Sequence, residues 1–580
     1  MKNIRYITIV VLFLLMGCAN DLTERNDNPN EPTSVPTPTL LINAQYRLVD
    51  DIRDEWFSGR MALLWSEYWT QSNYTDEDRY LYRENSNASA WKLIYTDLND
   101  LKTIIDLNVS EDSKGTMSGY GKNENQIAVA RILKSWTFLL LTETYGPIPY
   151  ESYGNDDPTF QALKLKSGII NPVYADQKAI YYDILNELKE ASKMIDESAI
   201  AFTQGDNIFH GNAGKWKRLA NSLVLRAAMR IRGVDPEIAN KAFQDAVTRG
   251  VMQSVDDDAL FKGENNASNA APFYKSFAVS NRTDFTMAKP FIDLLKGSVG
   301  PFNIVDPRLY FYAAPIGATA INNTGGKAIS QGDYLPVASD ELGSGIYIPE
   351  NYEGMPYGLD SKSTGSIGYN NVSLPNAPMQ ATFGNPFMDY AEVCFLLSEF
   401  NDWDQTYYEK GVRASMVRWG VQEKDIKDYI DQLPPASQET VLTQKYIALY
   451  MQPYNAWAEY RRTGFPKTLI KPGEVTFVDA EGVIDENQKG KEYYFISLVN
   501  DVQDDLPRRV KFSNEEPLLN PQGYQSGVEG LSSSVTAKLV AKSFPIQRPV
   551  LSPHTYQTNP TTSSSGGQDL MSTKLWWELE

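Results

Sequence analysis

Residues 123–146 read NENQIAVARILKSWTFLLLTETYG, and this stretch indicates the fold class. Asn123, followed three residues later by Gln126, has the spacing of a helix N-terminal cap. The residues after the cap are apolar on every side, and a helix of that kind is buried among other elements. The stretch therefore predicts a central helix in a mainly helical protein.

Two further stretches, residues 181–196 and 215–233, repeat apolar residues three or four positions apart. This spacing predicts an amphipathic helix with one buried face in each. The predicted buried residues are Ile184, Leu188, Ala191 and Ile195 in the first helix, and Trp216, Leu219, Leu223 and Ala227 in the second.

Glycine and proline mark where helices should end. The second of these helices should stop at Gly233, with Pro236 beyond it. Residues 444–464 also have a helical pattern, but Pro453 should kink or break that helix.

These patterns divide the chain into helical and loop-rich regions. Helical pairs are expected over about 41–235 and 385–465. The regions of about 255–385 and 470–570 are rich in Gly, Asn, Ser and Pro, so they predict long loops with few short strands. Long loops in a compact protein tend to carry function.

The N-terminus resembles a bacterial lipoprotein signal. Lys2 and Arg5 precede an apolar run over 7–16 that is too short to span a bilayer, and the run ends at Gly17–Cys18. We therefore expect residues 1–17 to be a signal peptide and the Cys18 thiol to carry a covalent lipid. The polar stretch over 18–39 is expected to be a flexible tether.

The location follows from the lipid. Acyl chains would anchor the protein to a membrane that no later segment is long enough to cross. Asp21 and Glu24 lie close to the lipid cysteine and resemble the signals that send lipoproteins to the outer face of the outer membrane. The second cysteine, Cys394, is expected to be a buried, inert thiol.

Composition and motifs exclude several classes of function. The 580 residues carry a formal net charge of −19, which argues against a nucleic-acid partner. No catalytic motif, metal-ligand cluster or phosphate loop is found, so neither an enzyme, nor a metal, nor a cofactor other than the lipid is predicted. The acidic pairs Asp76/Asp78 and Asp504/Asp505 have the residue types of a glycosidase, but solvated loops are the commoner cause of such pairs.

Aromatic residues in two loops suggest a ligand site. A ring can stack on the apolar face of a sugar while amide, carboxylate and guanidinium groups bond its hydroxyls, and the same mixture also suits peptides. The predicted ligand-binding residues are Trp69, Gln71, Asn73, Tyr74, Arg79, Tyr80 and Tyr82 in the first loop, and Tyr347, Tyr352 and Tyr357 in the second.

Several stretches together resemble the SusD/RagB family of outer-membrane lipoproteins, in the family's order and over nearly the whole chain. They are NDNPNEPTSVPTPTLLINA, ARILKSWTFLLLTETYGPIPYESY, IYYDILNELKEA, GKWKRLANSLVLRAAMRI, FMDYAEVCFLLSEF, YYEKGVRASMVRWGV, YIALYMQPYNAWAEYRRTGFP and LPRRVKFSNEEPLLN.

The resemblance implies a fold and a role. The fold would be a mainly α, TPR-containing SusD-like scaffold over 40–580, with a large loop-rich insertion. The role would be capture of a nutrient at the cell surface, as a lid on a TonB-dependent SusC-like transporter. Known members bind glycans, and RagB-type members bind peptides, so the ligand is expected to be an oligosaccharide or a peptide.

Two other functions remain open from the residues alone. A membrane-anchored glycoside hydrolase would need a carboxylate pair in a cleft. A TPR scaffold would bind another protein through its helices, and the loop aromatics would then play no part.

Overall fold

The computed structural model describes residues 35–280, 282, 284–316, 348–536 and 569–579. Most described residues of the two predicted helical regions are helical. The helices of the N-terminal half are α3 (Thr37–Ile52), α4 (Leu63–Trp65), α5 (Glu84–Val109), α6 (Lys114–Met117), α7 (Asn123–Tyr145), α8 (Gln177–Met194), α9 (Ala213–Ile231) and α10 (Pro236–Arg249).

Shorter helices follow in the loop-rich middle, and longer ones after it. They are α11 (Pro272–Tyr274), α12 (Lys289–Leu295), α13 (Leu309–Tyr312), α14 (Ser361–Ile367), α15 (Tyr390–Phe400), α16 (Gln405–Trp419), α17 (Glu423–Ile430), α18 (Gln438–Ala448), α19 (Pro453–Thr463), α20 (Glu516–Leu519) and α21 (Pro521–Thr536). Two π-helical turns, η1 (Glu55–Ala62) and η5 (Lys275–Val279), lie beside them; the 3₁₀ turns are η2 (Ser118–Tyr120), η3 (Leu165–Ser167), η4 (Val255–Asp257), η7 (Pro349–Asn351), η8 (Tyr369–Asn371), η9 (Ala377–Met379) and η10 (Trp576–Glu578).

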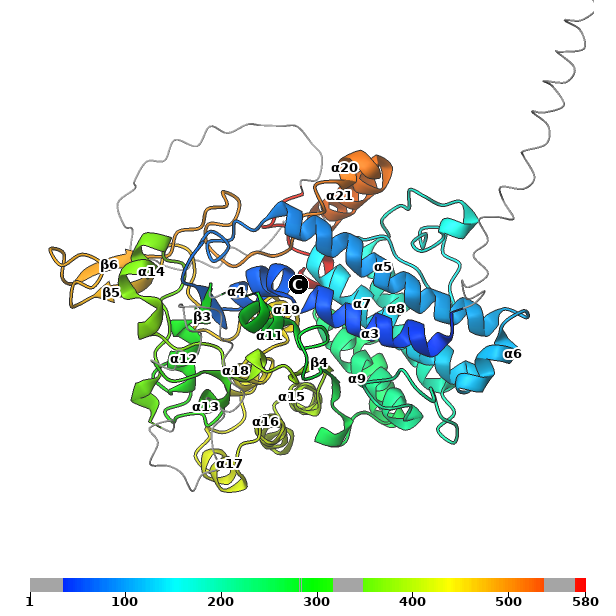
Figure 1. Ribbon diagram of the computed structural model, residues 1–580, viewed down its shortest axis with the longest axis horizontal. Coiled ribbons are helices and arrows are strands. Elements are labelled where there is room, and N and C mark those ends of the chain that lie inside the picture. The colour runs from blue at the N-terminus through cyan, green and yellow to red at the C-terminus, as the bar shows by residue number, and fades with distance from the viewer. Residues whose placement is uncertain (1–34, 281, 283, 317–347, 537–568, 580) are drawn as a thin grey trace, which may run out of the picture.

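The described strands form three antiparallel pairs. They are β1 (Trp69–Gln71) with β3 (Phe285–Met287), β2 (Ala259–Lys262) with β4 (Gly384–Met388), and β5 (Val475–Asp479) with β6 (Lys491–Tyr494). The β5–β6 hairpin projects from one end of the molecule (Figure 1).

The helices of the N-terminal half pack in chain order. α3 lies on α5, α5 on α7, α7 on α8, α8 on α9 and α9 on α10. Figure 1 shows α3, α5, α7, α8 and α9 together on one side of the molecule. α7 is buried along almost its whole length, and the predicted buried stripes of α8 and α9 are inside the protein. These predictions are confirmed.

The predicted helix boundaries are partly confirmed. α9 ends at Ile231, α10 begins with Pro236, and Pro453 begins α19 after a break from α18. The cap predicted for α7 is wrong: Lys122 precedes the helix without a side-chain cap. The Gln126 amide instead donates to the carbonyls of Met117 and Gly121, each at 2.8 Å, because its side chain is buried under that turn.

The ends of the predicted tether and of the second loop region also differ. Residues 37–39 belong to α3, since the fixed φ of Pro38 suits the first turn of a helix. The 16-residue helix α21 occupies part of the predicted 470–570 loop region. Its glycines at 523, 527 and 530 share one face and approach other residues so closely that a Cβ at Gly527 would lie 2.5 Å from the Tyr174 ring. The glycine content of α21 is typical of loops, but here it allows a helix to pack closely against its neighbours.

Buried ion pairs join the two helical regions. Arg230 of α9 contacts Glu143 of α7 at 2.7 Å and Glu459 of α19 at 2.5 Å. Glu459 also pairs with Lys445 at 2.9 Å and with Arg462 at 2.7 Å. Burial alone would raise the pKa of Glu459, but Arg462, Lys445 and Arg230 hold it well below its usual value.

The C-terminal residues complete this charged centre. The guanidinium of Arg461 lies 3.7 Å from the Trp457 ring centroid and 4.9 Å from that of Trp577. Arg461 also donates to the Glu578 carboxylate at 3.2 Å, and Arg230 lies 5.4 Å from the Trp577 ring centroid. Residues 577–578 are therefore part of the core, and Figure 1 places the C-terminus in the middle of the molecule.

Glu459→Gln is expected to lower the free energy of unfolding by about 3–5 kcal/mol, because it leaves buried cations without their shared carboxylate. Chemical denaturation of the wild-type and variant proteins measures this difference. Glu423→Gln is the control, since Glu423 pairs with Arg413 at an exposed position and should cost less than about 1 kcal/mol. Equal losses in the two variants would contradict the central role of Glu459.

Candidate functional site

The structure places most of the predicted ligand-binding rings inside the protein. Trp69 is fully buried on β1, 4.6 Å from the Phe273 ring centroid, and its indole N–H donates to the Tyr450 hydroxyl at 2.9 Å. Tyr80 and Tyr357 both pack edge-on against Phe495, at 5.2 and 5.3 Å.

The other predicted rings have similar surroundings. Tyr82 packs on Trp65 at 6.2 Å, and Tyr352 packs on Tyr310 at 5.5 Å. The expectation that Trp69, Tyr80, Tyr82, Tyr352 and Tyr357 offer ring faces to a ligand is therefore corrected: these rings fasten loops to the core. Tyr347 lies outside the described residues.

Three predicted residues remain at the surface. Asn73 is exposed, the Tyr74 side chain is 62% exposed, and Arg79 is partly exposed beside Asp76, to which it donates at 2.8 Å. Tyr74 also has a φ of +56°, which a residue with a Cβ adopts rarely and at a cost of about 1–3 kcal/mol. Residues held in such sparsely populated backbone conformations cluster at active sites and ligand-binding segments.

Buried carboxylates hold this loop in place. Asp78 accepts from the Thr70 hydroxyl at 2.5 Å and from the Gln71 backbone N–H at 2.9 Å. Glu77 accepts from the Gln71 amide at 2.9 Å and from Arg83 at 2.7 Å. Gln71 is thus a positioning residue of the loop, and its own side chain is buried.

A half-buried tryptophan lies beside the loop's anchor. Trp56 belongs to η1, whose first turn is capped by Asp54. The guanidinium carbons of Arg60, Arg282 and Arg83 lie 4.9, 5.0 and 5.5 Å from its ring centroid. These distances are within the range of cation–π attraction.

Three carboxylates balance the three arginines. Arg60 pairs with Asp284 at 2.5 Å and with Glu77 at 3.4 Å, whereas Arg282 lies 3.8 Å from Glu55 and Asp284. We call Glu55, Trp56, Arg60, Glu77, Arg83, Arg282 and Asp284 the Trp56 site. The Arg83 and Arg282 side chains are 44% and 37% exposed, so their remaining N–H groups are available to a ligand.

No pattern in the sequence predicted a role for Trp56, because it lies in a short segment between two helices. The π-helical turn that contains Trp56 is visible only in the folded chain. The same is true of its arginine neighbours, because Arg282 lies more than 200 residues away from Trp56 in the sequence. Such turns are frequent at functional sites. The Trp56 site can offer guanidinium donors and carboxylate acceptors around an aromatic ring, which is chemistry suited to binding hydroxyl-rich or peptide ligands.

The acidic pairs considered for glycosidase chemistry do not face one another as free carboxyl groups. Asp78 is buried and hydrogen-bonded, whereas Asp76 is exposed beside Arg79. Asp505 pairs with Arg508 at 2.6 Å. Within the described ranges, no group of three or more His, Cys, Asp and Glu side chains is arranged to hold a metal.

Two other expectations concern cysteine and the membrane. Cys394 is buried as predicted, and burial raises the pKa of its thiol to about 12. Cys18 and the predicted signal peptide lie outside the described residues. Among the helices that are described, none combines the length and apolar character needed to cross a membrane.

Comparison with known families assigns the chain. The SusD-like model described as "Starch-binding associating with outer membrane" matches residues 29–484, and the model described as "Susd and RagB outer membrane lipoprotein" matches residues 435–578. The chain belongs to the SusD-like family, whose descriptions place it at the outer membrane. No curated protein matches the sequence.

Solved structures show the same fold at low sequence identity. One described as a chitin-binding protein has a TM-score of 0.65 at 22% identity, covering 94% of this chain and 100% of that one. A chitin-binding SusD homologue from Flavobacterium johnsoniae has a TM-score of 0.62 at 21% identity, covering 93% and 98%. A SusD homologue from Bacteroides fragilis has a TM-score of 0.65 at 19% identity, covering 94% and 100%. The predicted mainly α, TPR-containing SusD-like fold is confirmed.

The loop anchor should respond to pH. Burial raises the pKa of Asp78 to about 8, although bonds from Thr70 and Gln71 oppose this shift. Between about pH 4 and 8 the folded state keeps a proton that the unfolded state has lost, so this carboxyl lowers stability as pH rises and its effect levels off above about 8.

Asp78→Asn removes this dependence. Relative to wild type, the variant is expected to gain stability between pH 5 and 8.5, by at most about 1.4 kcal/mol per pH unit. Urea unfolding at both pH values measures the difference. Asp54, whose pKa burial also raises to about 8, is unchanged in both proteins and cancels. A difference between the two proteins that is the same at both pH values would contradict a buried, protonated Asp78.

Proposed function

We propose that this protein is a cell-surface lipoprotein that captures a glycan and delivers it to a TonB-dependent transporter of the SusC type. The observation that carries the proposal is the family match over residues 29–484, described as starch-binding and associated with the outer membrane. Two structural neighbours are described as chitin-binding, which supports a glycan as the ligand.

The chemistry of the surface loop supports binding. Tyr74 offers an exposed ring, Asn73 an exposed amide and Arg79 a partly exposed guanidinium on one short segment. The carboxylates beneath it, Glu77 and Asp78, are engaged in hydrogen bonds that fix the loop. A fixed loop loses little conformational entropy when it binds.

Capture requires no catalysis, so no catalytic residue is assigned. The transporter would supply the energy for import. The protein's affinity for the ligand should be moderate, because the ligand must dissociate from it to enter the transporter. A peptide is the alternative ligand, because the second matching family includes RagB.

The binding test uses lipid-free protein, residues 19–580. It is titrated with starch- and chitin-derived oligosaccharides, with cellobiose, maltose and diacetylchitobiose, and with peptide digests; products are analysed after long incubation. Saturable binding of a sugar without new products is expected. Binding of peptides alone would show that the ligand is a peptide and not a glycan. Formation of new products would show that the protein hydrolyses its ligand.

Tyr74→Ala is expected to weaken oligosaccharide binding about two- to thirteenfold, the loss that corresponds to one aromatic contact of about 0.5–1.5 kcal/mol. Isothermal titration measures the affinity, and circular dichroism should show unchanged helix content, because the side chain is exposed. Tyr153→Ala, at another exposed tyrosine, is the control. Unchanged affinity in Tyr74→Ala would show that the ligand does not bind at this loop. Trp56→Ala would then be the next variant to test.

The proposed anchor has its own test. Cys18→Ala is expected to move the protein from the membrane fraction to the soluble fraction and to abolish labelling with a radioactive fatty acid. Cys394→Ala is the control, because that thiol is buried and should leave anchoring intact. An acylated, membrane-bound Cys18→Ala protein would refute lipid attachment at this residue.

A further inference from the structure

A groove runs along the outer side of α3, apart from the Trp56 site. Thr39, Ile42, Asn43 and Tyr46 line it from α3, and their spacing of three and four residues puts them on one face of that helix. The groove has a cavity volume of about 310 Å³. This lies at the lower end of the roughly 300–1,000 Å³ that is usual for small-molecule sites.

The opposite wall comes from distant parts of the chain. Phe261 and Lys262 of β2 line the groove together with Glu264 and Asn269 of the following loop, and Asn207 also contributes to the lining. The rings of Tyr46 and Phe261 meet at an angle of 62°, with 6.4 Å between centroids, and form the aromatic part of the lining.

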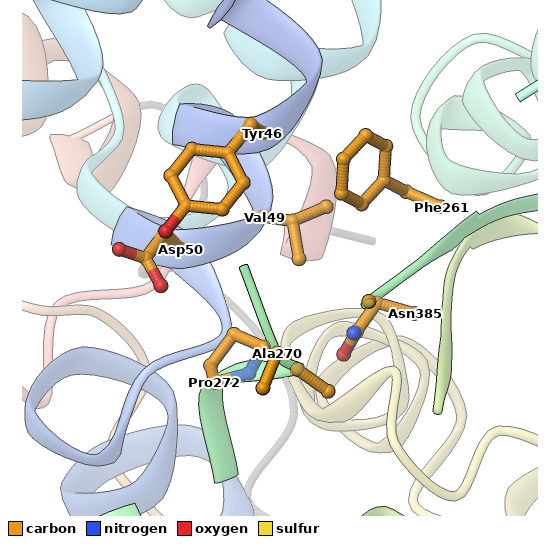
Figure 2. A pocket seen from close by; sticks show the side chains of 9 residues that line it. Tyr46, Val49, Asp50, Phe261, Ala270, Pro272 and Asn385 are labelled. Carbon is orange, nitrogen blue, oxygen red and sulfur yellow. The ribbon is translucent and has the colours of Figure 1, made fainter. Parts of the chain in front are cut away.

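A second, tighter pocket shares Tyr46 and Phe261 with the groove. Figure 2 shows Tyr46 and Phe261 on either side of Val49 in this pocket, with Pro272 and Asn385 facing them. The second pocket has no volume for a water molecule. A ligand in the groove would therefore meet a closed end at the two rings.

The walls are fixed before any ligand binds. The Tyr46 hydroxyl accepts from the Lys275 ammonium at 2.8 Å and donates to the Ser268 carbonyl at 2.9 Å. Lys275 is itself paired with Asp50 at 2.5 Å. The ring that forms the closed end is thus held from both sides.

The two loops of the groove are held by buried or bridging carboxylates. Glu264 accepts from the amides of Asn266 and Asn269 at 2.9 and 3.1 Å. Asp206, next to Asn207, accepts from the Gly211 N–H and from the Trp216 indole, each at 2.8 Å. A wall organised in this way loses little entropy on binding.

Polar groups in the groove are left free for a ligand. Among the described residues, the Lys262 ammonium makes no ion pair and the Asn207 side-chain amide makes no hydrogen bond, and both are exposed. Two rings, free amide and ammonium donors, and the Glu264 carboxylate surround the cavity. Rings with convergent amide and charged groups match the apolar faces and the hydroxyls of a sugar.

We infer that this groove between α3 and β2 is a second carbohydrate site, which binds one end of a short, uncharged oligosaccharide. The class of ligand rests on the proposed function, whereas the place of the site rests on the groove alone. A volume of about 310 Å³ with a closed end suits a disaccharide better than the middle of a long chain.

The test titrates cellobiose, maltose and diacetylchitobiose into four proteins: wild type, Asn207→Ala/Lys262→Ala, Asn43→Trp and Tyr74→Ala. The first variant removes free donors, and the second fills the groove from an exposed helix position. Both groove variants are expected to weaken disaccharide binding in the groove at least fivefold, whereas Tyr74→Ala should weaken only the binding at the surface loop. Lys489→Ala, at an exposed loop lysine, is the control.

Hydrogen exchange locates the bound sugar independently of affinity. Disaccharide binding should slow amide exchange in residues 259–272 of the wild type but not in the groove variants. Equal disaccharide affinity in wild type and both groove variants, or no slowing in 259–272, would overturn the second site and leave the proposed function standing. No sugar bound by any of the proteins would overturn both.

Discussion

The fold depends on one buried carboxylate, Glu459. It lies between three cations that come from different helices, Arg230 of α9, Lys445 of α18 and Arg462 of α19. Arg230 reaches α7 through Glu143, and Arg462 reaches α15 through Glu399 at 2.7 Å. Because a buried charge is tolerated only with its partners in place, the N-terminal and C-terminal helices must meet in one arrangement. The ligand loops are built on that fixed frame.

The loop over 71–82 shows how the frame serves binding. Tyr80 and Tyr82 point inward and pack on Phe495 and Trp65, while Asn73 and Tyr74 face solvent. Most of the aromatic content of this segment therefore stabilises the loop, and a small part of it remains for a ligand. The arrangement holds an exposed ring steady on a surface that would otherwise be flexible.

The sequence predicted the helices well, because apolar periodicity reports a local property. The stripes of α8 and α9, the buried α7 and the break at Pro453 all follow from residues within one helix length. The direction of the Trp69 and Tyr80 rings depends on residues more than 200 positions away, and periodicity carries no such information. Trp56 and the α3 groove were missed for the same reason, and α21 was missed because its glycines pack rather than turn.

The position of Trp577 and Glu578 has a consequence for the order of events during biosynthesis. Arg461 and Arg230 are buried against these two residues, so a nascent chain holds two guanidinium groups without these neighbours until residues 577 and 578 have been synthesised. The charged centre between the N-terminal and C-terminal helices is therefore completed only when this late segment packs against it.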